Sequence, residues 1–165
     1  QLWFNVPAAH KAEAPWYQYI RGAEMPPVAV KDGVHLTLVA GDYEDKKGPL
    51  KNFSPITAIW GNIEAGKEVT LTATRDYWTL LYVIDGKIKV NGTEAGPYHL
   101  VVFDKEDEQS DVHITALENT RLLYLCAEPI DEPVAAKDNF VMNTSAEIDQ
   151  AMEDYRNGLF GKLEQ

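Results

Sequence analysis

Short runs of β-branched, aromatic and other apolar residues recur through the middle of the chain, separated by residues typical of turns. Residues 34–40 show the pattern most simply, because Val34, Leu36 and Leu38 alternate with His35 and Thr37. A period of two places alternate side chains on opposite faces of a strand. We predict strands at 34–40, 56–63, 69–74, 78–85, 87–90, 99–103, 112–116 and 121–127. Strands at roughly ten-residue intervals indicate an all-β fold, an antiparallel sandwich or barrel.

The segments around these runs divide the chain into three predicted parts. Residues 1–33 carry four prolines and scattered aromatics, which favours an extended N-terminal arm or linker with one short edge strand. Residues 34–130 form the barrel, in which Asn91-Gly92 supplies a type I′ hairpin turn. Residues 131–165 form a C-terminal segment with a helix.

The helix prediction depends on a start signal and a helical period. Thr144 with Glu147 three residues later is typical of a capping box, and Gly158 lies where helices end. The apolar residues between them follow a helical spacing and are Ile148, Ala151, Met152 and Tyr155. We expect a helix over residues 145–157, whose apolar stripe covers either the end of the barrel or a neighbouring domain.

Composition narrows the class of partner. The 165 residues suit one ordinary domain, and a net charge of −11 with dispersed Lys and Arg argues against direct binding of nucleic acid. The acidity suits solubility or a docking surface for a basic partner. No run of 18 apolar residues exists and the opening residues are no secretory signal, so we expect neither a membrane span nor export. The chain lacks an initiator Met, so we expect a processed or incomplete product.

The residues with reactive or metal-binding side chains are few. The single cysteine, Cys126, lies in an apolar run, which predicts a buried inert thiol and a reducing compartment such as the cytoplasm, or the nucleus of a eukaryote. Four histidines occur without an H-x-H pair, and His113 is the only candidate for a fourth metal ligand. The acidic run 104–111 lacks the ligand order of a calcium loop and reads as a solvated turn.

The segment from Gly66 to Gly86 resembles the first signature of the cupin barrels. That signature is Gly, five residues, His-x-His, three or four residues, Glu, six residues and Gly. In this frame the ligand positions fall on Thr72, Thr74 and Thr79. Three neutral hydroxyls cannot hold iron, manganese or nickel tightly, so the frame predicts a cupin-type antiparallel β-barrel or jelly roll without its metal. The alternative is that threonines alternate here simply as good strand formers.

Both ends of the chain resemble the pirin family of two-barrel cupins. The opening QLWFNVPAAHK with PWYQYI is similar to the segment that joins the two barrels, and EPVAAKDNFVMNTSAEIDQAMEDYRNGLFG is similar to the closing motif and helix. KDNF at 137–140 departs from the glycine and proline that the family usually carries. The resemblance implies the second barrel of a pirin, which has lost its ligands. It places an iron-type metal, held by three histidines and a glutamate, in a first barrel absent from this sequence.

These observations leave three hypotheses open. The first is a non-catalytic, metal-free barrel without a cofactor of its own, which packs against the N-terminal cupin half or a second copy and helps to contact regulatory proteins. Its expected contacts are Trp3, Phe4, Trp16, Tyr17, Tyr19, Ile148, Met152 and Tyr155. The second is part of a quercetin-dioxygenase-type oxidoreductase, as the resemblance implies. The third is a small-molecule-binding barrel whose pocket would be lined by Thr72, Thr74, Thr79, Tyr82 and His113.

Overall fold

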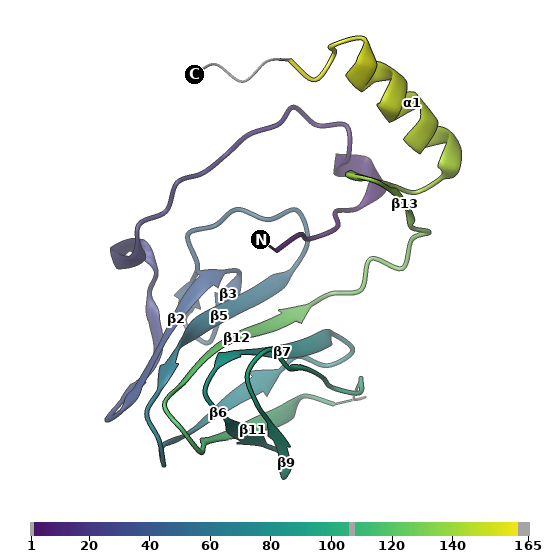
Figure 1. The fold of residues 1–165 in the computed structure, drawn as a ribbon. Coiled ribbons are helices and arrows are strands. Elements are labelled where there is room, and N and C mark those ends of the chain that lie inside the picture. Colours follow the sequence, from purple (N-terminus) through teal and green to yellow (C-terminus); the bar gives the residue numbers. More distant parts are fainter. Residues whose placement is uncertain (1, 106–107, 162–165) are drawn as a thin grey trace. The chain divides into compact units, whose positions relative to one another are not determined.

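The computed structural model describes residues 2–105 and 108–161 and divides them into two compact units (Figure 1). The larger unit is Trp16–Pro129. The smaller unit combines the segment that ends at Pro15 with the segment that begins at Ile130. The first 33 residues are therefore shared between the two units, and a 3-10 helix η2 (Gly22–Glu24) precedes the first strand of the larger one.

The larger unit contains two antiparallel sheets, as the all-β prediction required. In spatial order, the six-stranded sheet consists of β1 (Pro27–Lys31), β2 (Val34–Ala40), β5 (Ile56–Ile63), β12 (Thr120–Ala127), β7 (Trp78–Asp85) and β10 (Leu100–Val102). The four-stranded sheet consists of β6 (Glu68–Ala73), β11 (Ser110–Ala116), β8 (Ile88–Val90) and β9 (Thr93–Ala95). A small hairpin of β3 (Asp42–Tyr43) and β4 (Lys46–Lys47) follows β2. Strands distant in sequence lie side by side, as in jelly rolls (Figure 1).

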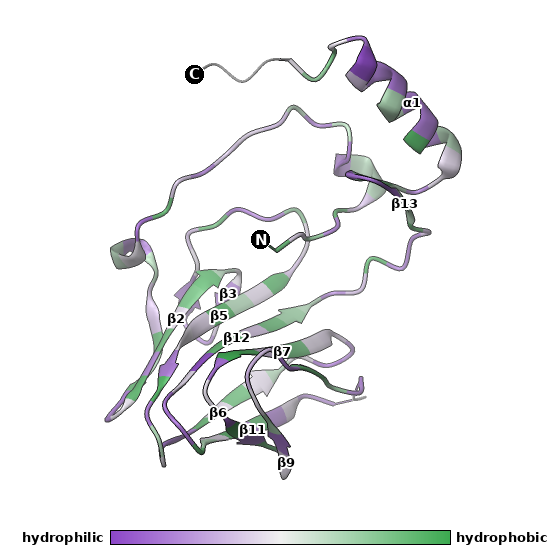
Figure 2. Ribbon diagram, viewed as in Figure 1, coloured by the Kyte–Doolittle hydropathy of each residue, from purple (hydrophilic) through white to green (hydrophobic). Residues whose placement is uncertain are grey.

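The alternation read from the sequence places side chains on the expected faces. In β2, Val34, Leu36 and Leu38 are fully buried, whereas His35 is exposed. Figure 2 shows the same change of hydropathy from residue to residue along the strands. Between β8 and β9, Asn91 and Gly92 have φ angles of 43° and 89°, which confirms the predicted turn with two positive φ values.

The core fills the space between the two sheets. Its side chains come from the inward positions of both sheets, and the largest fully buried one is Tyr124 of β12. Gly61 lies in the middle of β5 with φ 156°, and a Cβ atom built there would lie 2.0 Å from the carbonyl oxygen of His35 on β2. Only glycine therefore lets β2 and β5 come this close.

The smaller unit contains a 3-10 helix, a hairpin and one α-helix. Their bounds are η1 (Ala8–His10), β13 (Ala135–Lys137), β14 (Phe140–Met142) and α1 (Ser145–Arg156). The capping box of Thr144 and Glu147 is present, which confirms the predicted start of the helix. The helix packs on the hairpin and buries Ile148, and the Ala8 N–H donates to the Glu132 carboxylate at 2.8 Å. None of the helices within residues 2–105 and 108–161 is long and apolar enough to cross a membrane.

Candidate functional site

The threonines of the predicted ligand frame do not share a face. In β6 the buried side chains are those of Val69, Leu71 and Ala73, so the residues between them point away from the core. Thr72 is half-buried on the outer face, and Thr74, just after the strand, is exposed. The expectation that these two line the interior of the barrel is therefore wrong. Motif spacing does not fix the register, and a difference of one residue reverses the face of every side chain in a strand.

Thr79 is the one member of the frame that points inward. Its side chain is 2% exposed, and its hydroxyl donates to the Cys126 sulfur at 3.5 Å. The two residues face each other in the register between β7 and β12. The backbone N–H of Thr74 also donates to this sulfur, at 3.4 Å. The sulfur of the buried Cys126 thus accepts two hydrogen bonds, one from a side chain and one from the backbone.

Next to this pair, Tyr124 connects the two sheets. Its hydroxyl donates to the Thr72 carbonyl oxygen at 3.0 Å, while the Thr72 N–H donates to the Tyr43 hydroxyl at 3.1 Å. Burial raises the pKa of Tyr124 well above its ordinary value, and the neighbouring Cys126 raises it further. Tyr124 is therefore neutral at physiological pH and serves as a buried hydrogen-bond donor.

The side chains at this place do not fit the iron-type metal of cupin relatives. The inward donors are the hydroxyl of Thr79, the phenol of Tyr124 and the thiol of Cys126, and among the described residues no His, Asp or Glu is buried in the core with them. Within residues 2–105 and 108–161, no three His, Cys, Asp or Glu side chains gather closely enough to hold a metal ion. An octahedral iron or nickel ion requires more anionic or nitrogen donors than this cluster supplies.

His113 and Tyr82 also lie outside the core, so the predicted pocket is not assembled. His113 is exposed on β11, where its Nδ1 lies 3.0 Å from the Thr70 hydroxyl and its backbone N–H donates to Asn91 Oδ1 at 2.8 Å. Tyr82 is half-buried on the outer face of β7, because its neighbours Leu81 and Val83 occupy the inner face. Of the five predicted lining residues, Thr72, Thr74 and His113 thus lie on the outer side of the four-stranded sheet, whereas Thr79 and Tyr82 lie on opposite faces of the six-stranded sheet.

The outer face of the six-stranded sheet is unusually apolar. The strand registers align two rows of side chains across β5, β12, β7 and β10. The first row is Trp60, Leu123, Tyr82 and Leu100, and the second is Ala58, Leu125, Leu80 and Val102. Leu100 and Val102 are 55% and 57% exposed, whereas Ala58 and Leu125 are buried in a small second cluster with Ala40. We call these two rows the apolar outer face. The sequence carries its signal, since residues 78–85 and 121–127 are nearly continuous apolar runs rather than alternating ones.

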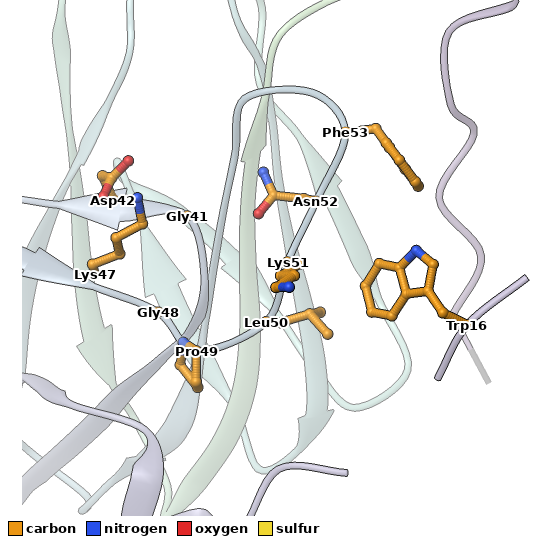
Figure 3. Close-up of a pocket in the computed structure, with 10 residues that line it drawn as sticks. All are labelled: Trp16, Gly41, Asp42, Lys47, Gly48, Pro49, Leu50, Lys51, Asn52 and Phe53. Carbon is orange, nitrogen blue, oxygen red and sulfur yellow. The ribbon is translucent and has the colours of Figure 1, made fainter. Parts of the chain in front are cut away.

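A pocket of about 520 Å³ lies between the start of the larger unit and the loop after β4 (Figure 3). It is lined by Trp16, Gly41, Asp42, Lys47, Gly48, Pro49, Leu50, Lys51, Asn52 and Phe53. A second hollow of about 460 Å³ shares part of this lining and extends to Thr74 and Tyr77. Burial, with the charge of Glu128, raises the pKa of Tyr77. Sequence reasoning missed the pocket because its residues come from segments far apart in the chain.

The side chains predicted as partner contacts are exposed near the N-terminus, whereas some of those on α1 are buried. Trp3, Phe4, Trp16, Tyr17 and Tyr19 are all exposed.

On α1 the prediction is partly wrong. Ile148 is only 3% exposed, because it packs inside the smaller unit, and Met152 is half-buried. Tyr155 is exposed and contacts the rings of Phe140 and Phe160 at centroid distances of 6.2 and 6.0 Å.

Two antiparallel sheets closed around one core, with jelly-roll connections, define a cupin-type barrel. The Pirin C-terminal cupin domain matches residues 59–161. The chain therefore belongs to the pirin family, and the match is to the second of its two barrels.

The relatives extend beyond this chain. It is 32% identical to Pirin-1 of Arabidopsis thaliana over 98% of its own length and 57% of that protein, and 27% identical to pirin of Homo sapiens over 98% and 56%. Among solved structures, a quercetin 2,3-dioxygenase from Acinetobacter baumannii superposes with a TM-score of 0.91 at 33% identity, covering 98% of this chain and 56% of that one. The chain thus spans little more than half the length of each of these three proteins.

Proposed function

We propose that this domain is the metal-free structural half of a pirin-type protein, which packs through its apolar outer face against a metal-bearing cupin domain. Where that domain is missing, the same face would join two copies of the chain. The observation that carries the proposal is the apolar outer face itself, with Leu100 and Val102 more than half exposed.

The nature of the barrel interior supports a role without a metal. The inward positions of β6 and β7 hold aliphatic side chains such as Leu71, Leu81 and Val83, with Thr79 as the polar exception. A core filled in this way leaves apolar packing where a catalytic cupin would need charged or imidazole ligands. The contribution of such a domain is then stability and shape.

The energetics of the outer face support a partner. Apolar surface removed from water contributes about 25 cal/mol per Å². Trp60 is exposed on β5, and Leu100 and Val102 are exposed on β10. The half-buried Leu123 and Tyr82 on the two strands between them continue the apolar row. Continuous apolar areas of this kind mark interaction sites. The exposed aromatics Trp3, Phe4, Tyr17 and Tyr19, together with Tyr155, would form a second set of contacts.

The lengths of the relatives favour a cupin domain as the partner. Pirin-1 and the Acinetobacter baumannii enzyme each contain a further stretch that this chain does not cover. In the family that stretch includes the other barrel, which would supply both the metal and a complementary apolar face. Regulatory proteins would bind the assembled pair rather than this domain alone.

Binding of the isolated N-terminal domain of Pirin-1 to this chain tests the proposal. We expect association measurable by sedimentation, and self-association of the chain when that domain is omitted. Leu100→Lys should weaken either association by about tenfold or more, because burying an unpaired ammonium group is strongly unfavourable. Leu117→Lys is the matched control, since Leu117 is also exposed but lies outside the apolar outer face. A chain that stays monomeric and binds no cupin domain would contradict the proposal.

Metal analysis addresses the second part of the proposal. We expect the purified chain to retain less than stoichiometric iron, nickel or manganese after dialysis against these ions. Retention of one equivalent, lost in Cys126→Ala or Thr79→Val, would show that the barrel interior binds metal after all.

The name of the Acinetobacter baumannii neighbour favours a second candidate, an oxidoreductase of the quercetin 2,3-dioxygenase type. In that case the reaction belongs to the complete two-barrel protein, and this domain supports it from outside the metal site. Activity that requires both domains, yet survives Thr79→Val in this one, would agree with that division. The small-molecule-binding barrel is less well supported, because core side chains occupy the interior.

A further inference from the structure

The pocket of Figure 3 is held in shape by hydrogen bonds from both sides. Gln18 fastens the first residues of the larger unit to the loop, since its amide donates to the Pro49 carbonyl at 2.9 Å and accepts from the Lys51 N–H at 3.3 Å. The Leu50 N–H donates to the Val39 carbonyl at 3.1 Å, which fixes the base of the loop against β2. The pocket is therefore formed before any ligand arrives, which lowers the entropy lost on binding.

One end of the pocket is aromatic and aliphatic. The rings of Trp16 and Phe53 lie 6.3 Å apart between centroids, at an interplanar angle of 60°. Figure 3 shows the indole of Trp16 facing the loop that carries Leu50 and Phe53. The Trp16 side chain is still half exposed, so a flat ring placed beside it would remove apolar surface from water.

The remainder of the pocket carries a net positive charge. Lys47 and Lys51 line it together with the single carboxylate of Asp42. Among the described residues, Lys46 pairs with Asp45, but neither Lys47 nor Lys51 takes part in an ion pair. The two ammonium groups outnumber the one carboxylate in the pocket lining. This part of the surface therefore attracts an anion, although the chain as a whole has a net charge of −11.

We propose that this pocket binds a flat aromatic monoanion of one or two rings, with the rings against Trp16 and Leu50 and the carboxylate at Lys51. Asp42 at the charged end disfavours a second negative charge, so dianions and phosphate esters bind less well. The volume of about 520 Å³ suits a ligand of this size. This site adjoins the apolar outer face, because Leu50 packs against the cluster that includes Ala58 and Leu125. Its aromatic and charged groups, Trp16 and Lys51, lie outside that face, so the site does not depend on the proposed docking role.

Titration of the ¹⁵N-labelled 165-residue chain with 2-naphthoate tests the proposal. We expect shifts at the Trp16 indole N–H and at the backbone of residues 47–53, with a dissociation constant on the order of 1 mM. The neutral isostere 2-naphthamide and the dianion 2,6-naphthalenedicarboxylate should each bind about fivefold more weakly, because one loses the ion pair and the other meets Asp42.

Variants separate charge from packing. Lys51→Gln should weaken 2-naphthoate about fivefold but leave 2-naphthamide unchanged, since the amide makes no ion pair to lose. Trp16→Leu should weaken both ligands about tenfold. Lys89→Gln, an exposed lysine on β8, is the matched control and should change neither. Equal binding of naphthoate and naphthamide, shifts centred on the apolar outer face, or no shift at 10 mM naphthoate (about ten times the expected constant) would each overturn the proposal.

Discussion

The two sheets of the barrel share one core but present different outer faces. The four-stranded sheet carries hydroxyl and charged side chains outward, including Thr70 and His113, which contact each other, and Thr115, which donates to Glu68 at 3.1 Å. The six-stranded sheet carries the apolar outer face. Both sheets bury equivalent aliphatic positions inside. The difference shows that burial inside the barrel accounts for only one face of β7 and β12. The apolar character of their other face is the feature on which the proposed docking role rests.

The largest expected effect distinguishes the two faces of one strand. Leu81→Ala should lower the free energy of unfolding by about 3 kcal/mol, because Leu81 is fully buried in the core and its loss leaves a cavity. Leu80→Ala, one residue earlier on the outer face, should lower it by about 1 kcal/mol, since that side chain is only half-buried. Urea denaturation of both variants measures the contrast. Equal losses would mean that the two faces are packed alike, contrary to our comparison.

A smaller effect tests the connection between the two sheets. Tyr124→Phe should lower the free energy of unfolding by roughly 1–2 kcal/mol, because the buried carbonyl of Thr72 on β6 loses its phenolic donor. Tyr82→Phe is the control on the same sheet: within the described residues its hydroxyl has no hydrogen bond, so we expect a change below about 0.5 kcal/mol. Thermal unfolding compares the two. Similar values for both would refute the role of Tyr124 as the link.

A substitution on the polar outer face should have less effect still. Thr70→Val removes the contact with His113 from an exposed strand position, and we expect a change within about 0.5 kcal/mol. It should also leave association with a cupin domain unaltered, because the four-stranded sheet is not the proposed docking face. Sedimentation and urea denaturation of the same sample check both expectations. Weakened association in this variant would shift the docking surface to the other sheet.

The smallest effect concerns the ion pairs, which occur on both sheets. Hydrogen bonds from Arg121 and Lys87 lower the pKa of Asp85 and of Glu94 below their ordinary values of 3.8 and 4.5. A lowered carboxyl pKa gives a contribution to stability that is present above the unfolded value and is lost as pH falls through the folded one. We expect this loss below about pH 4, equally on both sheets. Carboxyl ¹³C titration by NMR measures it, and an ordinary pKa for either group would contradict the pairing.

Much of the fold followed from periodicity and turn chemistry. The alternation in residues 34–40, the Asn91-Gly92 turn and the capping box at Thr144 each depend on neighbours in sequence, and each is present in the structure. Local patterns of this kind specify elements and often their faces.

The site was less accessible to sequence reasoning. The inward position of Thr79 and the outward position of Thr72 depend on registers between strands far apart in the chain, which no spacing rule fixes. The pocket likewise requires Trp16 to contact a loop more than 30 residues later in the chain. The hydrogen bonds of Gln18 with Pro49 and Lys51 hold this loop in place. Of the features of the site, only the apolar outer face was indicated by the sequence, through the nearly continuous apolar runs of β7 and β12.

Gly61 has a consequence for how the barrel avoids misfolding. If β2 and β5 paired one residue out of step, Trp60 or Asn62 would occupy the crossing at which only a hydrogen atom fits. The shifted arrangement, in which the wrong side chains turn inward, is thereby excluded by steric repulsion alone. The absence of one side chain at Gly61 thus favours the native pairing of β2 and β5, which keeps the apolar positions of both strands in the core.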